Sequence, residues 1–142
     1  MTDKDIERLR YDSRAKDLLK NDNYVITYEQ PLHSGKYLKL LSEIPAGSRV
    51  LEIGAGMGEN TVFLLDKELE VYATDISASS VEVMFKRFSH HLNFHSQIED
   101  MEKLSFSDEY FDVVCSAGSL SYGDNFLVME EIHRVLKSGG IY

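Results

Sequence analysis

The sequence predicts an α/β protein in which helices cover both faces of a doubly wound, mainly parallel sheet. Three observations lead to this class. Strand-like and helix-like segments alternate from residue 49 onward, glycines repeat directly after the first strand-like segment, and an aspartate closes the second. Such alternation is typical of βαβ units, because parallel strands need a crossover connection that is usually a helix.

The chain before the first strand divides into two parts. Residues 1–34 are polar and rich in tyrosine, and we expect them to form a short helix and a mobile loop that act as a lid. Residues 35–142 are expected to form the ligand-binding domain. From Gly35, apolar side chains follow the spacing of an amphipathic helix until Pro45 ends it.

The remaining elements follow in regular order. Strands are expected at residues 49–53, 71–75, 92–98 and 111–117, and helices at about 59–67, around 81–88 and around 126–136. The last helix is expected to end at Lys137-Ser-Gly139-Gly140. The closing letters GGIY are typical of a fifth strand that stops after one or two residues, so we expect the chain to end early.

Composition narrows the class of function. With 142 residues, 43% of them hydrophobic, the chain is long enough for one globular domain with its own core. Its net charge of −9 opposes binding to a phosphate backbone, so nucleic acid is not expected as a partner. No apolar run has the length of a membrane span or a signal peptide, which favours a cytoplasmic location. The single cysteine, Cys115, lies in an apolar strand and is expected to be buried and inert.

The glycine-rich stretch VLEIGAGMG at residues 50–58 indicates a ligand site. In doubly wound sheets the turn after the first strand is a common binding site for nucleotides. The dinucleotide pattern would place its third glycine at position 59, where this chain has Glu59. Glu52 also places negative charge beside the turn, which disfavours a pyrophosphate and favours a cationic ligand.

Asp75 ends the second strand, 21 residues after Gly54. A carboxylate there can accept hydrogen bonds from both hydroxyl groups of a ribose. The alternative is that Asp75 caps the helix that starts near Ser77. The order of strand, glycine turn, strand and acid predicts an adenosine-like ligand with a positive charge.

These residues resemble motif I of the class I S-adenosylmethionine-dependent methyltransferases, which have a Rossmann-like fold. The resemblance continues through IEDMEKLSFSDEYFDVV at 98–114 and EEIHRVLKSGG at 130–140, so it spans roughly residues 48–142. It implies S-adenosyl-L-methionine as the cofactor and S-adenosyl-L-homocysteine as the product. The family fold adds a further helix and an antiparallel pair of strands, and we expect these to be missing from this sequence.

The resemblance also implies a set of cofactor-binding residues. Asp75 would hold the ribose, Ile76 would pack on the adenine, Asp100 would accept a hydrogen bond from the adenine amino group, and Met101 would close that pocket or serve in the core. Glu52 would support the glycine turn and the ammonium group. The remaining residues would lie near the methionine part of the cofactor: Gly54, Ala55, Gly56, Gly58, Ser116 and Ala117.

The function implied is transfer of a methyl group to an oxygen or nitrogen atom of a small-molecule acceptor. The motif with which amino-group methyltransferases of nucleobases hold a planar nitrogen is missing after the fourth strand, where the sequence is SAGS. Ser119, Ser121 and Tyr122 follow that strand and could face the acceptor, although the Tyr122 ring could instead cover the cofactor. His33 in the amino-terminal loop is a second candidate base, unless it is a solvated loop residue.

Three further expectations complete this hypothesis. The histidines in HHLNFH at residues 90–95 lack an acid or cysteine that would complete a ligand set, so no metal is expected. An exposed sheet edge at the end of the chain would favour self-association. Two other functions stay open: a cofactor-binding module or truncated core without catalysis, and a nicotinamide dehydrogenase that uses Asp75 for its ribose.

Overall fold

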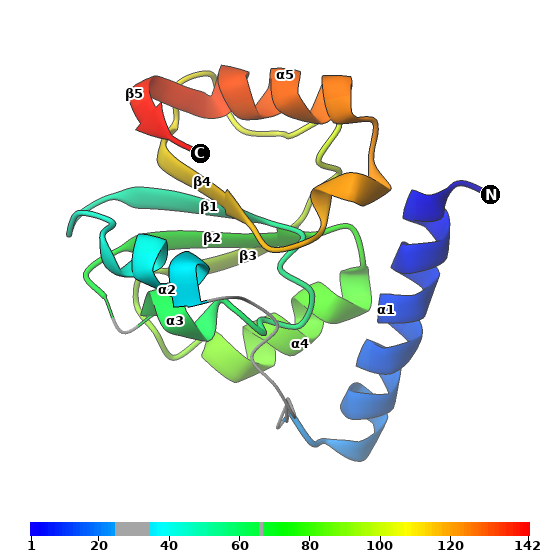
Figure 1. The fold of residues 1–142 in the computed structure, drawn as a ribbon. Coiled ribbons are helices and arrows are strands. Elements are labelled where there is room, and N and C mark those ends of the chain that lie inside the picture. The colour runs from blue at the N-terminus through cyan, green and yellow to red at the C-terminus, as the bar shows by residue number, and fades with distance from the viewer. Residues whose placement is uncertain (25–34, 66) are drawn as a thin grey trace.

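A computed structural model describes residues 1–24, 35–65 and 67–142 and confirms the predicted α/β class (Figure 1). The strands of the described residues form one sheet in the order β3-β2-β1-β4-β5, in which every neighbouring pair is parallel. Their bounds lie close to those expected: β1 Arg49–Ile53, β2 Glu70–Asp75, β3 Phe94–Ile98, β4 Phe111–Ser116 and β5 Leu136–Ile141.

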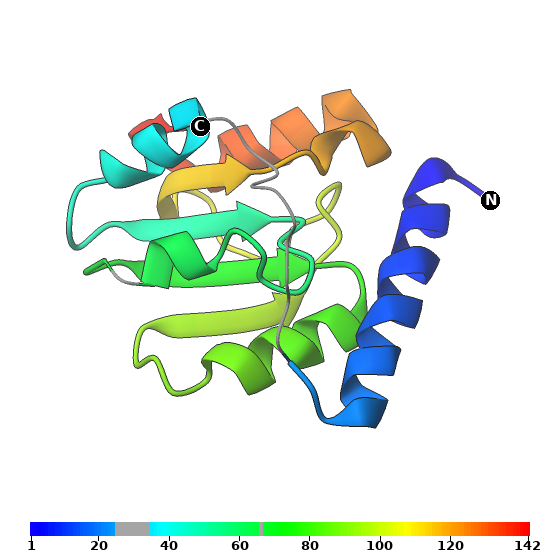
Figure 2. The same ribbon diagram turned by 60° about the horizontal axis from the view of Figure 1, so that its bottom comes forward.

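Helices cover both faces of the sheet, as predicted (Figures 1 and 2). On one face, α5 contributes Val128 and Ile132 to a buried cluster that includes Leu51 of β1. On the other face, α2 and α3 pack against Val50 and Val71, and α4 packs against Ala73 of β2, because successive side chains of a strand point to opposite faces. The helices are α1 Asp3–Asn21, α2 Gly35–Ser42, α3 Val62–Leu65, α4 Ala78–Phe88 and α5 Asn125–Val135, with a short 3₁₀ helix at Leu120–Tyr122.

The amino-terminal helix α1 is longer than expected, with 19 residues in place of a short helix. The Thr2 hydroxyl accepts a hydrogen bond from the Asp5 backbone and the Asp5 carboxylate accepts one from Thr2, a capping box that starts the helix. Ala15 packs with Met57 and Val83 in a small buried cluster between α1 and α4. Figure 2 shows α1 standing beside the edge of the sheet toward which the strands point. The expected mobile loop falls on residues 25–34, which lie outside the described residues.

Two further elements differ from the expectation. Helix α3 spans only Val62–Leu65, because the segment after Gly58 forms a turn with backbone hydrogen bonds between residues three apart. Helix α5 ends at Val135, and β5 begins at Leu136 instead of at the two glycines. The pairing of β5 with β4 is irregular: Leu136 pairs with Phe111 and Ile141 pairs with Val113, so β5 has more residues between the two pairs than β4 has. The extra residues include Gly139, which has a positive φ of 79°.

None of the helices formed by the described residues has the length and apolar character that a membrane crossing requires.

Candidate functional site

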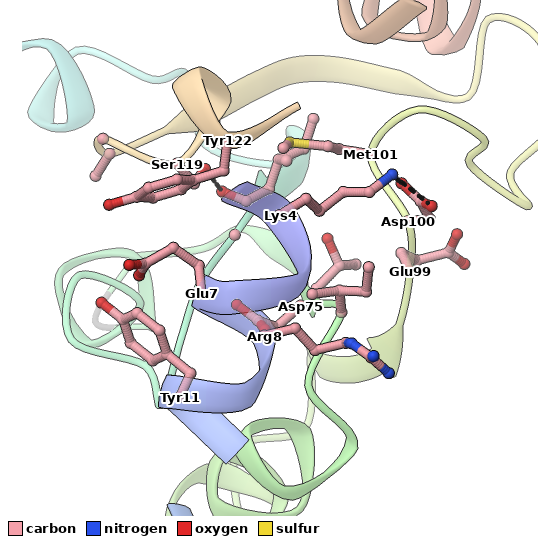
Figure 3. Close-up of a pocket in the computed structure, with 16 residues that line it drawn as sticks. Lys4, Glu7, Arg8, Tyr11, Asp75, Glu99, Asp100, Met101, Ser119 and Tyr122 are labelled. Carbon is pink, nitrogen blue, oxygen red and sulfur yellow. Dashed lines mark hydrogen bonds and ion pairs between the residues drawn. The ribbon is translucent and has the colours of Figure 1, made fainter. Parts of the chain in front are cut away.

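A cavity of about 120 Å³ lies at the carboxyl edge of the sheet, beneath α1 (Figure 3). The sheet order places β1 and β4 side by side, with β2 and β3 beyond β1 and β5 beyond β4, so the connections diverge at this point. Ligands of doubly wound sheets bind at such a switch point. The predicted site residues that line the cavity are Gly54, Asp75, Ile76, Asp100, Met101, Ala117 and Tyr122.

The glycine turn is required by the packing of the protein itself. Gly54, with a φ of 63°, adopts a left-handed conformation that other residues rarely adopt, and a Cβ there would collide with the Ser119 side chain. A Cβ at Gly58, with a φ of 89°, would collide with the Phe88 ring of α4. The repeated glycines therefore bring β1 close to both the loop after β4 and helix α4.

Asp75 joins the glycine turn to the end of β2. Its carboxylate accepts hydrogen bonds from the backbone N–H groups of Gly56 and Ser77, each at 2.9 Å. Burial raises the pKa of Asp75, and these backbone hydrogen bonds act in the opposite direction. The residue that caps α4 is Ser77, whose hydroxyl accepts from the Ser80 N–H, so Asp75 does not take the helix-capping role. Its remaining lone pairs are available to hydroxyl donors.

The opposite end of the cavity is closed by an ion pair that the sequence did not indicate. The Lys4 Nζ of α1 lies 3.1 and 3.3 Å from the two carboxylate oxygens of Asp100 and 2.5 Å from Glu102 Oε2. Burial acts against the charge of Lys4, but the hydrogen bonds to Glu102 and Asp100 outweigh it and raise the Lys4 pKa. Lys4 thus donates to the carboxylate that the sequence assigned to an adenine amino group.

Glu52 lies on the other side of the glycine turn and is not among the residues that line the cavity. Its side chain is buried, with 2% of its surface exposed, and Thr61 Oγ1 donates a hydrogen bond of 2.5 Å to it. Burial raises the pKa of Glu52 to about 7, the Thr61 hydrogen bond lowers it, and the charge of Asp75 adds to the rise. Alternation along β1 turns Glu52 toward the face opposite Ile53.

The other predicted residues divide by position. Ala55, Gly56 and Gly58 form the turn without lining the cavity, and the Ser116 hydroxyl lies behind the cavity, 2.7 Å from the Ser119 hydroxyl. Ser119 lines the cavity, whereas His33 lies outside the described residues.

Sequence reasoning missed the contribution of α1 to the cavity. Four of its side chains line it, at the spacing i, i+3, i+4 and i+7 of one helix face: Lys4, Glu7, Arg8 and Tyr11. The signal was present in this spacing, but the residues are polar and give no apolar periodicity.

A buried inert cysteine was expected, and Cys115 is buried, with a pKa raised by burial and then by the charge of Glu52. The ring of His95 stacks on that of Tyr72, with the centroids 4.4 Å apart. Within the described ranges, no group of three histidine, cysteine or acidic side chains is arranged to hold a metal ion.

The family model described as "Methyltransferase domain" matches residues 50–140, which include the glycine turn, Asp75 and Asp100. The chain belongs to this methyltransferase family. It is a class I S-adenosylmethionine-dependent methyltransferase domain with a Rossmann-like fold.

Curated relatives of this methyltransferase domain are named for several different activities. It is 30% identical over 123 residues to the demethylmenaquinone methyltransferase of Staphylococcus haemolyticus, covering 84% of this chain and 52% of that protein. It is 30% identical over 105 residues to the sarcosine/dimethylglycine N-methyltransferase of Aphanothece halophytica, covering 68% and 36%. It is 34% identical over 106 residues to the ubiquinone/menaquinone biosynthesis C-methyltransferase of Neisseria gonorrhoeae, covering 70% and 42%. The chain thus spans about half the length, or less, of these relatives.

Solved structures agree with this assignment. The phosphoethanolamine N-methyltransferase 2 of Haemonchus contortus, solved in complex with S-adenosyl-L-methionine, superposes with a TM-score of 0.65 and 26% identity. The match covers 73% of this methyltransferase domain and 25% of that chain.

The residues around the cavity suit the cofactor of the family in their chemistry. Asp75 and Asp100 supply acceptors for hydroxyl and amino groups, and Ile76 and Met101 supply apolar surface. The cavity is smaller than the roughly 300–1,000 Å³ of pockets that hold drug-sized ligands, and four side chains of α1 line it.

Proposed function

We propose that this methyltransferase domain binds S-adenosylmethionine in the cavity beneath α1 and transfers its methyl group to an oxygen or nitrogen atom of a small molecule. The observation that carries the proposal is the position of Asp75, the last residue of β2, and Asp100, which follows the neighbouring strand β3; both line the same cavity. Two acceptors so placed match an adenosine group, which offers ribose hydroxyls and an amino group as donors.

When bound, the cofactor supplies a methyl group already activated by a positively charged sulfur. The protein then contributes position and the exclusion of water more than covalent chemistry. Asp75 would orient the cofactor through the ribose, held rigidly by its two backbone hydrogen bonds. Ser119 and Tyr122 both line the cavity, but the Ser119 hydroxyl donates to the Ile53 carbonyl and lies 2.7 Å from the Ser116 hydroxyl, which leaves Tyr122 as the hydroxyl that would face an acceptor.

A small acceptor is supported by two features of the chain. The net charge of −9 opposes a nucleic-acid substrate. Helix α1 also lies over the cavity, and its side chains leave little room for a bulky substrate. We further infer that α1 acts as the lid of the site.

Methylation of a carbon atom is a second candidate. It is favoured by the relative from Neisseria gonorrhoeae, which is named as a C-methyltransferase of quinone biosynthesis. The relative from Aphanothece halophytica, named as an N-methyltransferase, favours an amine instead.

The test is methyl transfer from labelled S-adenosylmethionine to a panel of hydroxylated, amino and quinol-type small molecules, with products identified by mass spectrometry. We expect the 142-residue chain to bind S-adenosylhomocysteine in calorimetry and to methylate at least one class of acceptor. Binding without turnover on every acceptor would favour the non-catalytic module. Affinity for NAD, with none for S-adenosylhomocysteine, would favour the dehydrogenase.

A further inference from the structure

Helix α1 spans the cavity from one end to the other. Lys4 and Tyr11 both line it and are seven residues apart, which corresponds to about 10 Å along a helix axis. Lys4 is bound to Asp100. At the other end, burial and then the negative charge of Glu59 raise the pKa of Tyr11, so this ring lies near Glu59. Glu59 accepts a hydrogen bond from the Met57 N–H, which places Tyr11 at the glycine-turn end.

Glu7 lies between these two ends, one helical turn before Tyr11. Figure 3 shows its carboxylate directed toward the rings of Tyr11 and Tyr122, whereas the Lys4 ammonium points the other way, to Asp100. Only 17% of the Glu7 side-chain surface is exposed. Its Oε1 accepts from Arg10 Nη1 at 3.0 Å, but its Oε2 is buried and has no hydrogen-bond partner in the part of the chain that the structure describes.

In the other carboxylates that line the cavity, each oxygen already accepts at least one hydrogen bond. Asp75 accepts from Gly56 and Ser77 through its two oxygens. Both Asp100 oxygens face Lys4, and both Glu99 oxygens accept hydrogen bonds from Ser105. Among the lining carboxylates of the described ranges, Glu7 is thus the one with an unpaired oxygen.

An unpaired buried carboxylate oxygen is unfavourable in the free protein, because it has lost water without gaining a donor. Arg10 already balances part of the Glu7 charge through Oε1, so what the free protein lacks is a donor for Oε2, and a cationic donor there would form a charge-assisted hydrogen bond. The methionine part of S-adenosylmethionine carries such a group, its α-ammonium. The sequence suggested Glu52 for this group, but Glu52 is buried against Thr61 and does not line the cavity.

We propose that Glu7 is the carboxylate that binds the α-ammonium group of the cofactor. This inference rests on the proposed function, because it assumes that the cavity holds S-adenosylmethionine. Helix α1 then has a direct binding role: its Glu7 holds the methionine part of the cofactor. Glu7 is a binding and positioning residue and takes no part in the chemical step.

The test compares two ligands that differ at the group in question. S-adenosylhomocysteine has the α-ammonium, whereas 5′-methylthioadenosine keeps the adenosine and sulfur but lacks the amino-acid part. Calorimetry with each ligand is done on the wild type, on Glu7→Gln and on Asp17→Asn. Asp17 is exposed on the same helix and does not line the cavity, so its variant controls for the loss of one negative charge.

We expect Glu7→Gln to weaken binding of S-adenosylhomocysteine about tenfold or more, the scale of a charge-assisted hydrogen bond. Binding of 5′-methylthioadenosine should change by less than about twofold, and Asp17→Asn should leave both affinities near the wild type. Because S-adenosylhomocysteine has no sulfonium, a loss seen with it cannot arise from the charge on sulfur. Glu7→Ala, which keeps a high helix propensity, should show the same discrimination and guards against a folding defect in the first variant.

Two results would overturn the inference while leaving the proposed function intact. One is a wild type that binds S-adenosylhomocysteine and a Glu7→Gln variant that binds it equally well. The other is an equal loss of affinity for both ligands. A wild type that binds neither ligand would overturn the proposed function and this inference together.

Discussion

Replacing Glu52 with glutamine should change how the stability of the domain depends on pH. Glu52 is buried and its pKa rises from 4.5 to about 7 on folding, chiefly because burial disfavours the charged form. Between these two values the unfolded chain has lost this proton and the folded protein has kept it. The free energy of unfolding therefore falls as the pH rises from about 4.5 to 7, and this effect is complete above pH 7.

The magnitude follows from the same two values. One pKa unit corresponds to about 1.4 kcal/mol, so the change from 4.5 to about 7 corresponds to roughly 3 kcal/mol. Glutamine cannot ionise, but its carbonyl oxygen can still accept the hydrogen bond from Thr61. The amide N–H₂ adds a donor to this buried position, at a cost that does not vary with pH. The wild type should thus lose roughly 3 kcal/mol relative to Glu52→Gln between pH 4.5 and 7.

The assay is urea unfolding of both proteins at a series of pH values from 4 to 8, analysed as the difference in free energy of unfolding. Contributions of all other groups cancel in this difference to the extent that they are independent of Glu52. Glu68→Gln is the control, because Glu68 is exposed and its variant measures how removal of a surface carboxylate changes the free energy of unfolding. Parallel curves for the wild type and Glu52→Gln, separated by a constant amount, would refute the reasoning.

Three more predictions concern the cavity and the support of its walls. Asp75→Ala should weaken binding of S-adenosylhomocysteine by about 1.5–3 kcal/mol, because a charged acceptor for the ribose is lost. An unchanged dissociation constant in calorimetry would show that Asp75 does not bind the ribose. Lys4→Met should tighten the same binding by up to about fivefold, because the ligand no longer competes with a partly exposed ion pair for Asp100; weaker binding would show that Lys4 assists the ligand. Arg134→Met should lower the free energy of unfolding by about 2–4 kcal/mol, because this guanidinium holds Glu131 and the backbone carbonyls of Leu104 and Phe106 together; a melting temperature equal to that of the wild type would contradict it.

Most strands and their parallel arrangement could be predicted because the signals are local. The segment at 49–53 forms β1 as expected, since it is short, mainly apolar and followed by glycines. At Gly54 and Gly58 a Cβ atom would collide with neighbouring side chains, so these two positions require glycine. The acids at the ends of β2 and β3 could be located for the same reason, because the sequence pattern indicates where each strand ends. The alternation of strands and helices then leaves few arrangements for a parallel sheet.

Helix α1 shows where this kind of inference fails. Its polar face gives no apolar period, so its length of 19 residues was not expected. The helix is placed by contacts with distant segments: Ala15 packs on Met57 and Val83, and the Asp12 carboxylate accepts hydrogen bonds from Ser77 and Ser79 at the start of α4. Such contacts depend on the completed fold and leave no trace in the neighbouring residues.

By itself, the sequence determined the fold class, the family and the glycine turn with its acids at the strand ends, because each depends on residue types at fixed short spacing. Only the tertiary structure decided which carboxylates face the cavity. In the structure, Glu52 lies on the face of β1 opposite Ile53, where Thr61 donates a hydrogen bond to it. Lys4 and Glu7, from the start of the chain, line the cavity at the carboxyl edge of the sheet. The physical reason is that the surroundings of a side chain are set by packing between segments far apart in sequence, and packing also sets its pKa and its partners.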